Sequence, residues 1–407
     1  MNAIAPPYRG PEPPNPRPGG RSLEIRHLAV ADGLGHPSEA NGVHNVARAL
    51  VREQRAAGER ASLVLLARGD IAPKADATCP TRIVRMEGLA LRGRTVRLSQ
   101  ATIEALLAEA GPATVCHIHG GREPMLRGLA QALRCRGIPY AITVHGRFSH
   151  VYDPAGRTLK RSTALYLRLF ERRLLEGARV VQALSGEEAT ILRRVAPRAR
   201  IKIIGNGAYS SRLGALPAAP AARAPSPEFP HFGYCGRYAI AHKGLDLLLE
   251  GFAAYVNSGG AGRLTMLGSG PAQAELVRMA ARLGIAGRVR ILGPRFGDAR
   301  DAALLECDYF IMASRFEGVP LAALEAALLG LPLIVTAGTG LRAVVMAERA
   351  GLPIAEHSAA AVGAALHEAA ALSPAEWRAR AAAAHALVAR HGDWTEISAR
   401  LRESYLR

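Results

Sequence analysis

Several residue types and patterns are scarce in this sequence of 407 residues, and each absence narrows the class of protein. The five cysteines show no CxxC spacing, so neither a disulfide framework nor a zinc-thiolate site is indicated. Aromatic residues make up only 5% of the chain, which leaves little material for a base-stacking surface. A nucleic-acid-binding protein, which the excess of arginine suggests, is therefore the weaker alternative.

Long apolar runs are also missing. No stretch approaches the roughly 20 apolar residues that a membrane-spanning helix needs. The first residues lack the apolar core of a secretory signal and are rich in proline and glycine, as disordered segments are. We therefore expect a cytoplasmic protein with a disordered leader at residues 1–22.

The positive charge is unevenly distributed. The net charge is +18, and residues 1–215 carry 33 basic and 17 acidic side chains, whereas residues 216–407 carry 19 and 17. A basic first half would be attracted to an anionic membrane surface or to phosphorylated molecules. One expectation is thus peripheral association with the inner face of the membrane, and the other is a solvated, arginine-rich surface.

Short apolar runs alternate with amphipathic stretches along the chain, which predicts parallel strands joined by helices. The strand-like runs are 23–30, 61–67, 114–119, 140–145, 179–184, 200–205, 231–236, 263–268, 288–293, 308–313 and 331–336. The predicted fold class is α/β, with two tandem doubly wound (Rossmann-like) domains facing a central cleft.

Composition also places the domain boundaries. Residues 213–230 are rich in proline and alanine, as linkers between domains are. We predict a first domain at 23–212, the linker at 213–230, a second domain at 231–392, and a terminal helix at 393–407 that crosses back to the first domain.

Two cations stand in the loop that follows residues 231–236. Arg237 and Lys243 lie between Gly236 and Gly244, ahead of a predicted helix. The planar fork of arginine and the compact ammonium of lysine suit a diphosphate, and the start of the helix adds partial positive charge. Loop cations are more often simply solvated, so this pattern alone assigns no site.

Two carboxylates flank a predicted helix start at Pro320. Glu317 precedes the helix and Glu325 lies more than a turn inside it, so the two can reach different parts of one ligand. Carboxylates accept hydrogen bonds from hydroxyl groups, which indicates sugar partners. The apolar neighbours of Glu325 argue against a carboxylate that merely faces water.

The segment SRFEGVPLAALEA, followed by GLPLIV, resembles the Glu-x7-Glu signature of the retaining glycosyltransferase family 4, which has the GT-B fold. The residues GR and HKG around Arg237 and Lys243 resemble the phosphate loop of that family, and the likeness extends over residues 232–340. The resemblance implies that Glu325 holds the nucleotide ribose, that Glu317 lies beside the donor sugar, and that the two cations bind the diphosphate.

The resemblance also implies a full set of site residues. Those implied in catalysis are Arg237, Lys243, Glu317 and His145. Those implied in donor binding are Gly42, Arg237, Lys243, Gly268, Gly270, Glu317, Gly318, Val319, Leu321 and Glu325. No cofactor and no metal are expected, because the family needs no metal and the substrate is itself a nucleotide-diphosphate sugar of UDP or GDP type. The region around Asp32 lacks partners at ligand spacing.

The first domain resembles the family more loosely. Asn41-Gly42 stands where the family has a glycine pair, and such a helix start admits a phosphate. His145 follows a strand at the place where the family often has a histidine near the donor sugar. The next residue, frequently aspartate in the family, is Gly146 here.

Two further histidines and one turn in this domain favour structural interpretations. His117 and His119 alternate on a strand, and we favour a polar strand end lining the acceptor side over a pair of metal ligands. Asn206-Gly207 resembles the turn between the domains of the family, so we expect it to be structural.

These observations predict a metal-independent hexosyltransferase that retains the anomeric configuration. It would transfer a hexose from a nucleotide-diphosphate sugar to a hydroxyl of a saccharide or lipid-linked acceptor, in surface polysaccharide or glycolipid biosynthesis. Charge on the leaving diphosphate would be stabilised by Arg237, Lys243 and helix amides. The alternatives are a sugar-nucleotide epimerase of related two-domain fold and a catalytically inactive sugar-nucleotide-binding protein.

Overall fold

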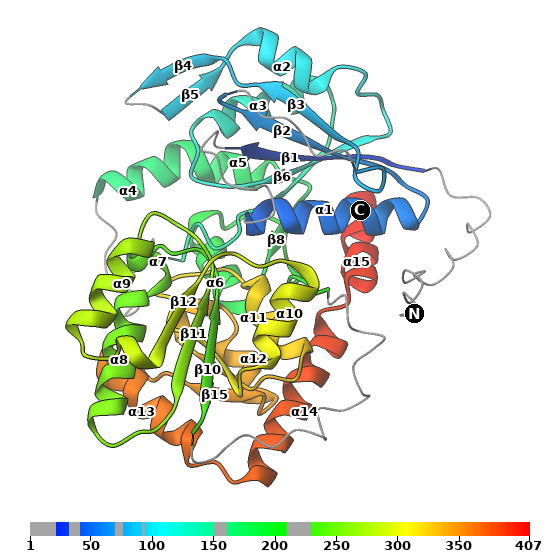
Figure 1. Cartoon of the computed structure of the whole chain (residues 1–407). Coiled ribbons are helices and arrows are strands. Elements are labelled where there is room, and N and C mark those ends of the chain that lie inside the picture. The colour runs from blue at the N-terminus through cyan, green and yellow to red at the C-terminus, as the bar shows by residue number, and fades with distance from the viewer. Residues whose placement is uncertain (1–21, 32–40, 70–75, 92–93, 150–160, 210–228) are drawn as a thin grey trace, which may run out of the picture.

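The computed structural model describes residues 22–31, 41–69, 76–91, 94–149, 161–209 and 229–407. Asp32, almost the whole predicted leader and most of the predicted linker lie outside these residues. Within them the chain forms two parallel sheets, each flanked by helices, so the predicted α/β fold class is confirmed. Figure 1 draws the domain of the first half above that of the second.

Seven parallel strands form the sheet of the first domain, in the order β3-β2-β1-β6-β7-β8-β9. Their bounds are β1 Glu24–Ala31, β2 Arg60–Ala67, β3 Thr81–Arg85, β6 Thr114–His119, β7 Tyr140–Thr143, β8 Val180–Ala183 and β9 Ile201–Ile203. The strand order reverses between β1 and β6. The carboxyl ends of strands at such a reversal are where open α/β sheets bind ligands.

The helices of this domain are α1 Gly42–Ala56, α2 Gln100–Leu107, α3 Met125–Cys135, α4 Arg161–Tyr166, α5 Arg172–Glu176 and α6 Gly186–Val195, with a π-helical turn at Leu167–Glu171 between α4 and α5. An antiparallel hairpin, β4 Gly88–Leu91 with β5 Arg94–Leu98, stands apart from the sheet. The sequence interpretation passed over residues 81–98, because the strands there are short, every residue of β4 is exposed, and only isolated apolar side chains such as Val84 and Leu98 enter the core.

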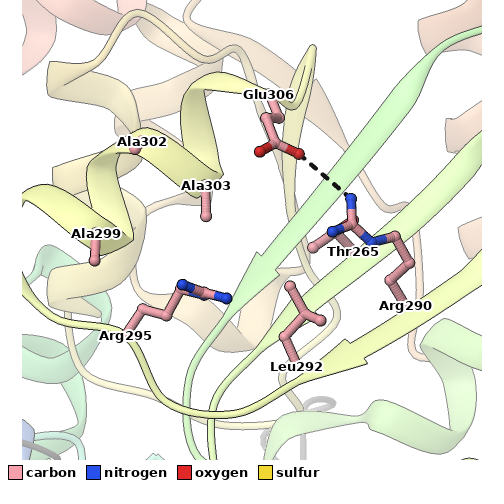
Figure 2. Close-up of a pocket in the computed structure, with 8 residues that line it drawn as sticks. All are labelled: Thr265, Arg290, Leu292, Arg295, Ala299, Ala302, Ala303 and Glu306. Carbon is pink, nitrogen blue, oxygen red and sulfur yellow. Dashed lines mark hydrogen bonds and ion pairs between the residues drawn. The ribbon is translucent and has the colours of Figure 1, made fainter.

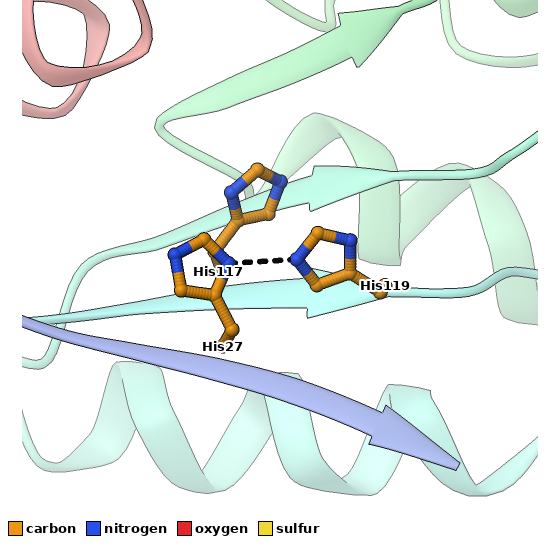
Figure 3. A group of neighbouring side chains, drawn as sticks. All are labelled: His27, His117 and His119. Carbon is orange, nitrogen blue, oxygen red and sulfur yellow. Dashed lines mark hydrogen bonds between the residues drawn. The ribbon is translucent and has the colours of Figure 1, made fainter. Parts of the chain in front are cut away.

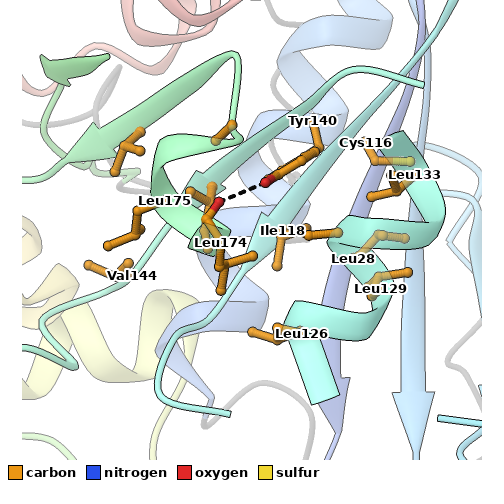
Figure 4. Close-up of a cluster of buried hydrophobic side chains, with 14 of the residues drawn as sticks. Leu28, Cys116, Ile118, Leu126, Leu129, Leu133, Tyr140, Val144, Leu174 and Leu175 are labelled. Carbon is orange, nitrogen blue, oxygen red and sulfur yellow. Dashed lines mark hydrogen bonds between the residues drawn. The ribbon is translucent and has the colours of Figure 1, made fainter. Parts of the chain in front are cut away.

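The two faces of the first sheet have different cores. One face packs Leu28 and Ile118 against α3 and α5, and Figure 4 shows this cluster together with the hydrogen bond from the Tyr140 hydroxyl to the Leu174 carbonyl. On the other face Ile25 and neighbouring apolar residues pack against α1. Side chains alternate along a strand, so His27 of β1 shares this second face with Ile25.

Six parallel strands form the sheet of the second domain, in the order β12-β11-β10-β13-β14-β15. Their bounds are β10 His231–Cys235, β11 Arg263–Leu267, β12 Val289–Leu292, β13 Tyr309–Met312, β14 Leu333–Val335 and β15 Gly351–Pro353. The helices are α7 Ile240–Lys243, α8 Leu245–Asn257, α9 Gln273–Arg282, α10 Gly297–Leu305, α11 Leu321–Leu328, α12 Arg342–Ala347, α13 Ala359–Ala370 and α14 Pro374–His391. Here the strand order reverses between β10 and β13.

The last helix, α15 Trp394–Leu406, packs on the first domain rather than on the second. In Figure 1 it is the red helix that lies beside the blue α1. Trp394, Leu401 and Tyr405 belong to the same apolar cluster as Ile25 of β1. In addition, Arg179 donates a hydrogen bond of 2.6 Å to the carbonyl of Tyr405. The end of the chain is therefore part of the core of the first domain.

Candidate active site

The loop after β10 brings two cationic side chains to the strand-order reversal of the second sheet. Gly236 and Arg237 follow the strand directly, and Lys243 is the last residue of the short helix α7. Gly244 adopts a left-handed conformation with φ of 61°, and a Cβ there would lie 2.0 Å from the carbonyl oxygen of Ala313. The loop after β10 is thus held against the end of β13, next to the segment that carries Glu317.

Lys243 and Glu317, both predicted from the sequence to act in the site, form an ion pair with each other. Both side chains are 12% exposed, and the Ser314 hydroxyl lies 3.3 Å from the same carboxylate oxygen. His242 Nε2 lies 4.0 Å from that oxygen, and an Arg237 nitrogen lies 3.4 Å from the other ring nitrogen of His242. Lys243 and His242 therefore lie against one carboxylate at the carboxyl edge of the sheet, and Arg237 lies against the far side of His242.

Glu325, in the middle of α11, has a partner within the protein. Its carboxylate accepts a hydrogen bond of 2.6 Å from Arg300 of α10, and Arg300 also binds the fully buried Asp301 at 2.6 Å. Burial raises the pKa of Glu325, and the guanidinium of Arg300 opposes that rise. The cation of Arg300 therefore stabilises the charged form of this largely buried carboxylate. One carboxylate oxygen is already bonded to Arg300 before any ligand binds.

The two domains touch next to Glu317. A Cβ on Gly146, which follows β7 in the first domain, would lie 2.2 Å from the backbone nitrogen of Gly318. The Ser149 hydroxyl donates a hydrogen bond of 3.0 Å to the Glu317 carbonyl, and the Asn206 amide donates one of 2.7 Å to the Val319 carbonyl. The segment that begins α11 is thus positioned by both domains.

Two family descriptions match the chain, one in each domain. "Glycosyl transferase 4-like domain" matches residues 41–207, and "Glycosyl transferases group 1" matches residues 229–371. The chain belongs to the group 1 glycosyltransferases. Its predicted resemblance to glycosyltransferases of GT-B fold is confirmed, and so is the prediction that it is a glycosyltransferase.

Two curated proteins that are similar in sequence to this glycosyltransferase are themselves named as glycosyltransferases. It is 29% identical over 271 residues to the 2-deoxystreptamine glucosyltransferase of Streptomyces kanamyceticus, a match that covers 62% of this chain and 69% of the relative. It is 27% identical over 266 residues to the 2-deoxystreptamine N-acetyl-D-glucosaminyltransferase of Streptomyces fradiae, covering 61% and 62% of the two chains.

Solved structures share the fold over nearly the whole length. Sucrose-phosphate synthase from Thermosynechococcus elongatus superposes with a TM-score of 0.67 at 20% identity, covering 94% of this chain and 98% of that one. HepE from Anabaena, in complex with UDP and glucose, superposes with a TM-score of 0.68 at 16% identity, covering 93% and 98%. At these identities the likeness establishes the fold alone.

Gly268 and Gly270, which the sequence analysis assigned to donor binding, also allow two loops of the protein to pack closely. A Cβ on Gly268 would lie 1.9 Å from the Gly236 carbonyl oxygen, and a Cβ on Gly270 would lie 2.5 Å from that of Tyr238. The loops after β10 and β11 therefore approach each other backbone to backbone. Whether these two glycines also admit the nucleotide stays a prediction.

The start of α11 and the start of α1 differ in how their amides are satisfied. Leu321 begins α11 after Pro320, and no side chain among the described residues caps this helix. Its first amides can therefore face an anion, as predicted for the backbone of Gly318, Val319 and Leu321. At α1, by contrast, the Asn41 side chain already accepts hydrogen bonds from Val43 and His44, so fewer amides near Gly42 remain for a phosphate.

His145, the catalytic candidate of the first domain, lies at the contact between the domains. It is partly buried, has a left-handed backbone with φ of 51°, and its Nε2 lies 2.9 Å from Nδ1 of His119. Burial lowers the pKa of His145 from 6.5 to about 3, so the ring is neutral at physiological pH. The expectation for His117 and His119 was wrong: with 0% and 3% exposure they lie inside the domain and line no open surface.

Two residues at the site were missed by the sequence analysis. His242 is adjacent to Lys243 in the AHKG stretch, and its nearness to the predicted lysine was the only available signal. Arg300 lies on α10, and the sequence separation of 25 residues from Glu325 carries no hint of contact. Only the packing of α10 beside α11 brings this pair together.

A small pocket lies away from these residues. It has a volume of about 190 Å³ between β11, β12 and α10, and Figure 2 shows Arg290, Arg295 and Glu306 along its wall. Arg290 and Glu306 form an exposed ion pair at 3.4 Å. None of the predicted site residues lines this pocket, so it does not belong to the candidate active site. Among the described residues, no helix has the length and apolar character needed to cross a membrane.

Proposed function

We propose that this chain is a retaining family 4 glycosyltransferase that moves a hexose from a UDP or GDP sugar to a hydroxyl group. The observation that carries the proposal is the Lys243–Glu317 ion pair at the strand-order reversal of the second sheet, where the first domain contacts the same segment. A cation and a carboxylate at such a position suit the diphosphate and the sugar of one donor.

The chemistry proposed for this site is mainly electrostatic. Lys243, together with Arg237 and the uncapped amides of α11, would stabilise the negative charge that develops on the departing diphosphate. Glu317 would accept hydrogen bonds from the donor sugar, and Glu325 would accept them from the ribose. The acceptor oxygen forms a bond to the anomeric carbon as the bond to the diphosphate breaks, and the acceptor proton leaves with the diphosphate.

The proposed donor sugar is a hexose or an N-acetylhexosamine. This choice is supported by the names of the curated relatives, which specify a glucosyl and an N-acetylglucosaminyl group, and by the UDP and glucose of the HepE complex. For the acceptor we propose a saccharide, or a lipid-linked saccharide of surface polysaccharide or glycolipid biosynthesis. The basic first half of the chain supports an acceptor at an anionic membrane surface.

We also propose that transfer needs no metal ion. The groups available for the diphosphate are the cations Arg237 and Lys243, and these supply the positive charge that a divalent ion would otherwise provide. Activity is therefore expected to persist after dialysis against EDTA. Loss of turnover that Mg²⁺ or Mn²⁺ restores would contradict this part of the proposal.

The test of the function combines a binding screen with a transfer assay. Thermal melting of the full chain with UDP-, GDP- and ADP-sugars identifies the donor, because a ligand that binds the native state raises the melting temperature. That donor is then incubated with 2-deoxystreptamine, with simple saccharides, and with lipid-linked saccharides in anionic vesicles. The product is analysed by NMR for an anomeric configuration identical to that of the donor.

Each alternative function gives a different result in this assay. A rearranged sugar released from the donor without any acceptor would show an epimerase. Strong melting shifts without turnover on any acceptor class would show an inactive sugar-nucleotide-binding protein. An inverted anomeric configuration in the product would be consistent with a glycosyltransferase but would refute the retaining mechanism.

A further inference from the structure

A network of buried polar side chains crosses the first sheet beneath His145. It consists of Gln54, His27, His117, His119, Thr143, Gln182 and Tyr405, and each of them is at most 3% exposed. These residues come from α1, from four strands of the sheet and from the last helix α15. The strands pair so that His27 lies opposite His117 and Thr143 opposite Gln182, which places the polar side chains in one row across the sheet.

At one end of this network a backbone carbonyl, which can only accept, fixes which atom of each hydrogen bond is the donor. The Gln182 amide nitrogen donates to the Ile204 carbonyl at 2.9 Å, so its amide oxygen faces Thr143. Thr143 donates to that oxygen at 2.5 Å and therefore accepts from His117 Nε2 at 2.7 Å. A neutral imidazole with its proton on Nε2 has a lone pair on Nδ1. His117 Nδ1 is thus an acceptor.

The direction of the hydrogen bonds continues through Tyr405 of the last helix, α15, towards Gln54 of α1. His117 Nδ1 lies 2.6 Å from the Tyr405 hydroxyl, which must donate to it. The oxygen of Tyr405 is then free to accept, and its interaction with Gln54 lowers the pKa of the Tyr405 hydroxyl against the rise caused by burial. The Gln54 amide nitrogen is buried and makes no hydrogen bond among the described residues, so we assign it as the donor that faces this oxygen. The Gln54 amide oxygen lies on the other side, against His27.

The hydrogen bonds between Gln54 and His145 can be assigned in the same way. His27 Nε2 lies 2.8 Å from the Gln54 amide oxygen, so it carries the proton and His27 Nδ1 is an acceptor. His119 Nε2, 2.8 Å away, donates to it, which leaves His119 Nδ1 as an acceptor. His145 Nε2, 2.9 Å from His119 Nδ1, must therefore carry the proton of that ring. The hydrogen bonds from Gln54 to His145 all point the same way, and so do those from Tyr405 to Ile204.

We infer that Tyr405 and Gln54 are positioning residues, which hold His145 in the tautomer with its proton on Nε2 and a lone pair on Nδ1. In that tautomer Nδ1 accepts a hydrogen bond from a hydroxyl group and cannot donate one. The ring therefore offers a hydrogen-bond acceptor, which suits a hydroxyl group such as that of a sugar. The part of this inference that concerns turnover rests on the proposed function, whereas the tautomer itself does not.

The same histidines could be considered as a metal site, and the geometry argues against it. Candidate ligand atoms of His27, His117 and His119 lie within 4.8 Å of one another, and Figure 3 shows the three rings side by side. Their centroids are 4.4 to 5.2 Å apart with interplanar angles of 21 to 35°, so the lone pairs of the stacked rings do not converge. No carboxylate belongs to the group, and a buried dication would lack a compensating charge.

The experiment compares two tyrosine variants of the full chain. Tyr405→Phe removes the hydroxyl that links the two ends of the network, and Tyr140→Phe is the matched control. Tyr140 is equally buried, and its hydroxyl donates to a backbone carbonyl outside the network. Long-range ¹H–¹⁵N NMR of ¹⁵N-histidine protein reports the tautomer of each ring, and the His145→Gln spectrum identifies the His145 signals.

We expect a single Nε2-protonated His145 in the wild type and in Tyr140→Phe, and a mixture of tautomers in Tyr405→Phe. Turnover of Tyr405→Phe should fall about 3- to 10-fold, the effect of one buried hydrogen bond, while the melting shift caused by the free nucleoside diphosphate, which lacks the sugar, stays unchanged. Gln54→Met should act in the same way as Tyr405→Phe, and it replaces that variant if the latter does not fold.

Several results would overturn the inference. A wild-type His145 protonated on Nδ1, or present as a mixture, refutes it without any variant. Equal effects of Tyr405→Phe and Tyr140→Phe would show a merely structural role for both. About one metal ion per chain in the purified protein, lost in His27→Gln, would show a metal site instead. Absence of transfer by the wild type would refute the proposed function, and the NMR result would still decide the tautomer.

Discussion

The carboxyl ends of the two sheets meet at one place but differ in electrostatic character. In the second domain the end of the sheet carries charged groups, with Lys243 paired to Glu317 and Arg300 paired to Glu325. In the first domain the corresponding end carries the neutral imidazoles of His119 and His145, because burial lowers the pKa of His119 well below its usual value and that of His145 to about 3. The same topology therefore provides one charged and one neutral surface.

Under the proposed function, this difference would divide the binding of one donor between the two domains. Charged side chains suit a diphosphate, since their interaction grows as negative charge develops on the leaving group. Neutral hydrogen-bonding groups suit hydroxyls and add no charge close to the anomeric carbon. Four predictions test this comparison, from the largest expected effect to the smallest.

The largest effect is expected for the cation of the second domain. Lys243→Ala should lower kcat/KM for the donor at least about 100-fold, because it removes a preorganised charge from the leaving diphosphate. Lys202→Ala, on the partly buried strand β9 of the first domain, is the matched control. Steady-state transfer kinetics measure both variants. Near-normal turnover of Lys243→Ala would refute the role of the charged second-domain surface in binding the diphosphate.

The second prediction concerns the partner of Glu325. Arg300→Leu should weaken donor binding about 10-fold at neutral pH, because the guanidinium no longer opposes the rise that burial causes in the pKa of Glu325. A carboxyl with a raised pKa ionises again as the pH rises, so the loss should shrink towards alkaline pH. Donor binding is measured from pH 6 to 9 by titration calorimetry. A loss independent of pH would mean that Arg300 itself contacts the donor.

The third prediction concerns the contact that joins the two surfaces. Gly146 has φ of 73°, and a Cβ there would meet the backbone nitrogen of Gly318, so Gly146→Ala should separate the domains locally. We expect turnover to fall several-fold and the melting temperature to drop by a few degrees. Gly186→Ala is the control, since a Cβ at Gly186 meets no other atom within 4 Å. Equal behaviour of the two variants would show that this contact has no functional importance.

The smallest effect at neutral pH concerns the neutral histidines of the first domain. The pKa values of His27 and His145 lie below the ordinary value of 6.5, so the unfolded chain binds more protons than the native one between pH 6.5 and about 4. The free energy of unfolding should therefore fall as the pH decreases through this range. Urea unfolding at several pH values measures the slope. His27→Gln should reduce it, and His391→Gln, whose side chain is 54% exposed, should not.

Much of the fold and part of the candidate site could be predicted from the sequence. The alternation of apolar runs with amphipathic stretches is a local property, so it reported both parallel sheets. The site residues around Lys243 and Glu317 were recognisable because each stands in a short motif at the end of a strand. The exposed strand β4 left no such pattern, and Arg300 gave no local signal of its contact with Glu325.

The sequence by itself determined the class of the protein, since the spacing of Glu317 and Glu325 and the loop with Lys243 are contiguous patterns. Only the tertiary structure decided what surrounds His145. The residues that hold its ring come from positions as distant as Gln54 and Tyr405, and hydrogen-bond polarity is transmitted across a sheet rather than along the chain. Such a network depends on strand register and on the return of the last helix, which no local pattern encodes.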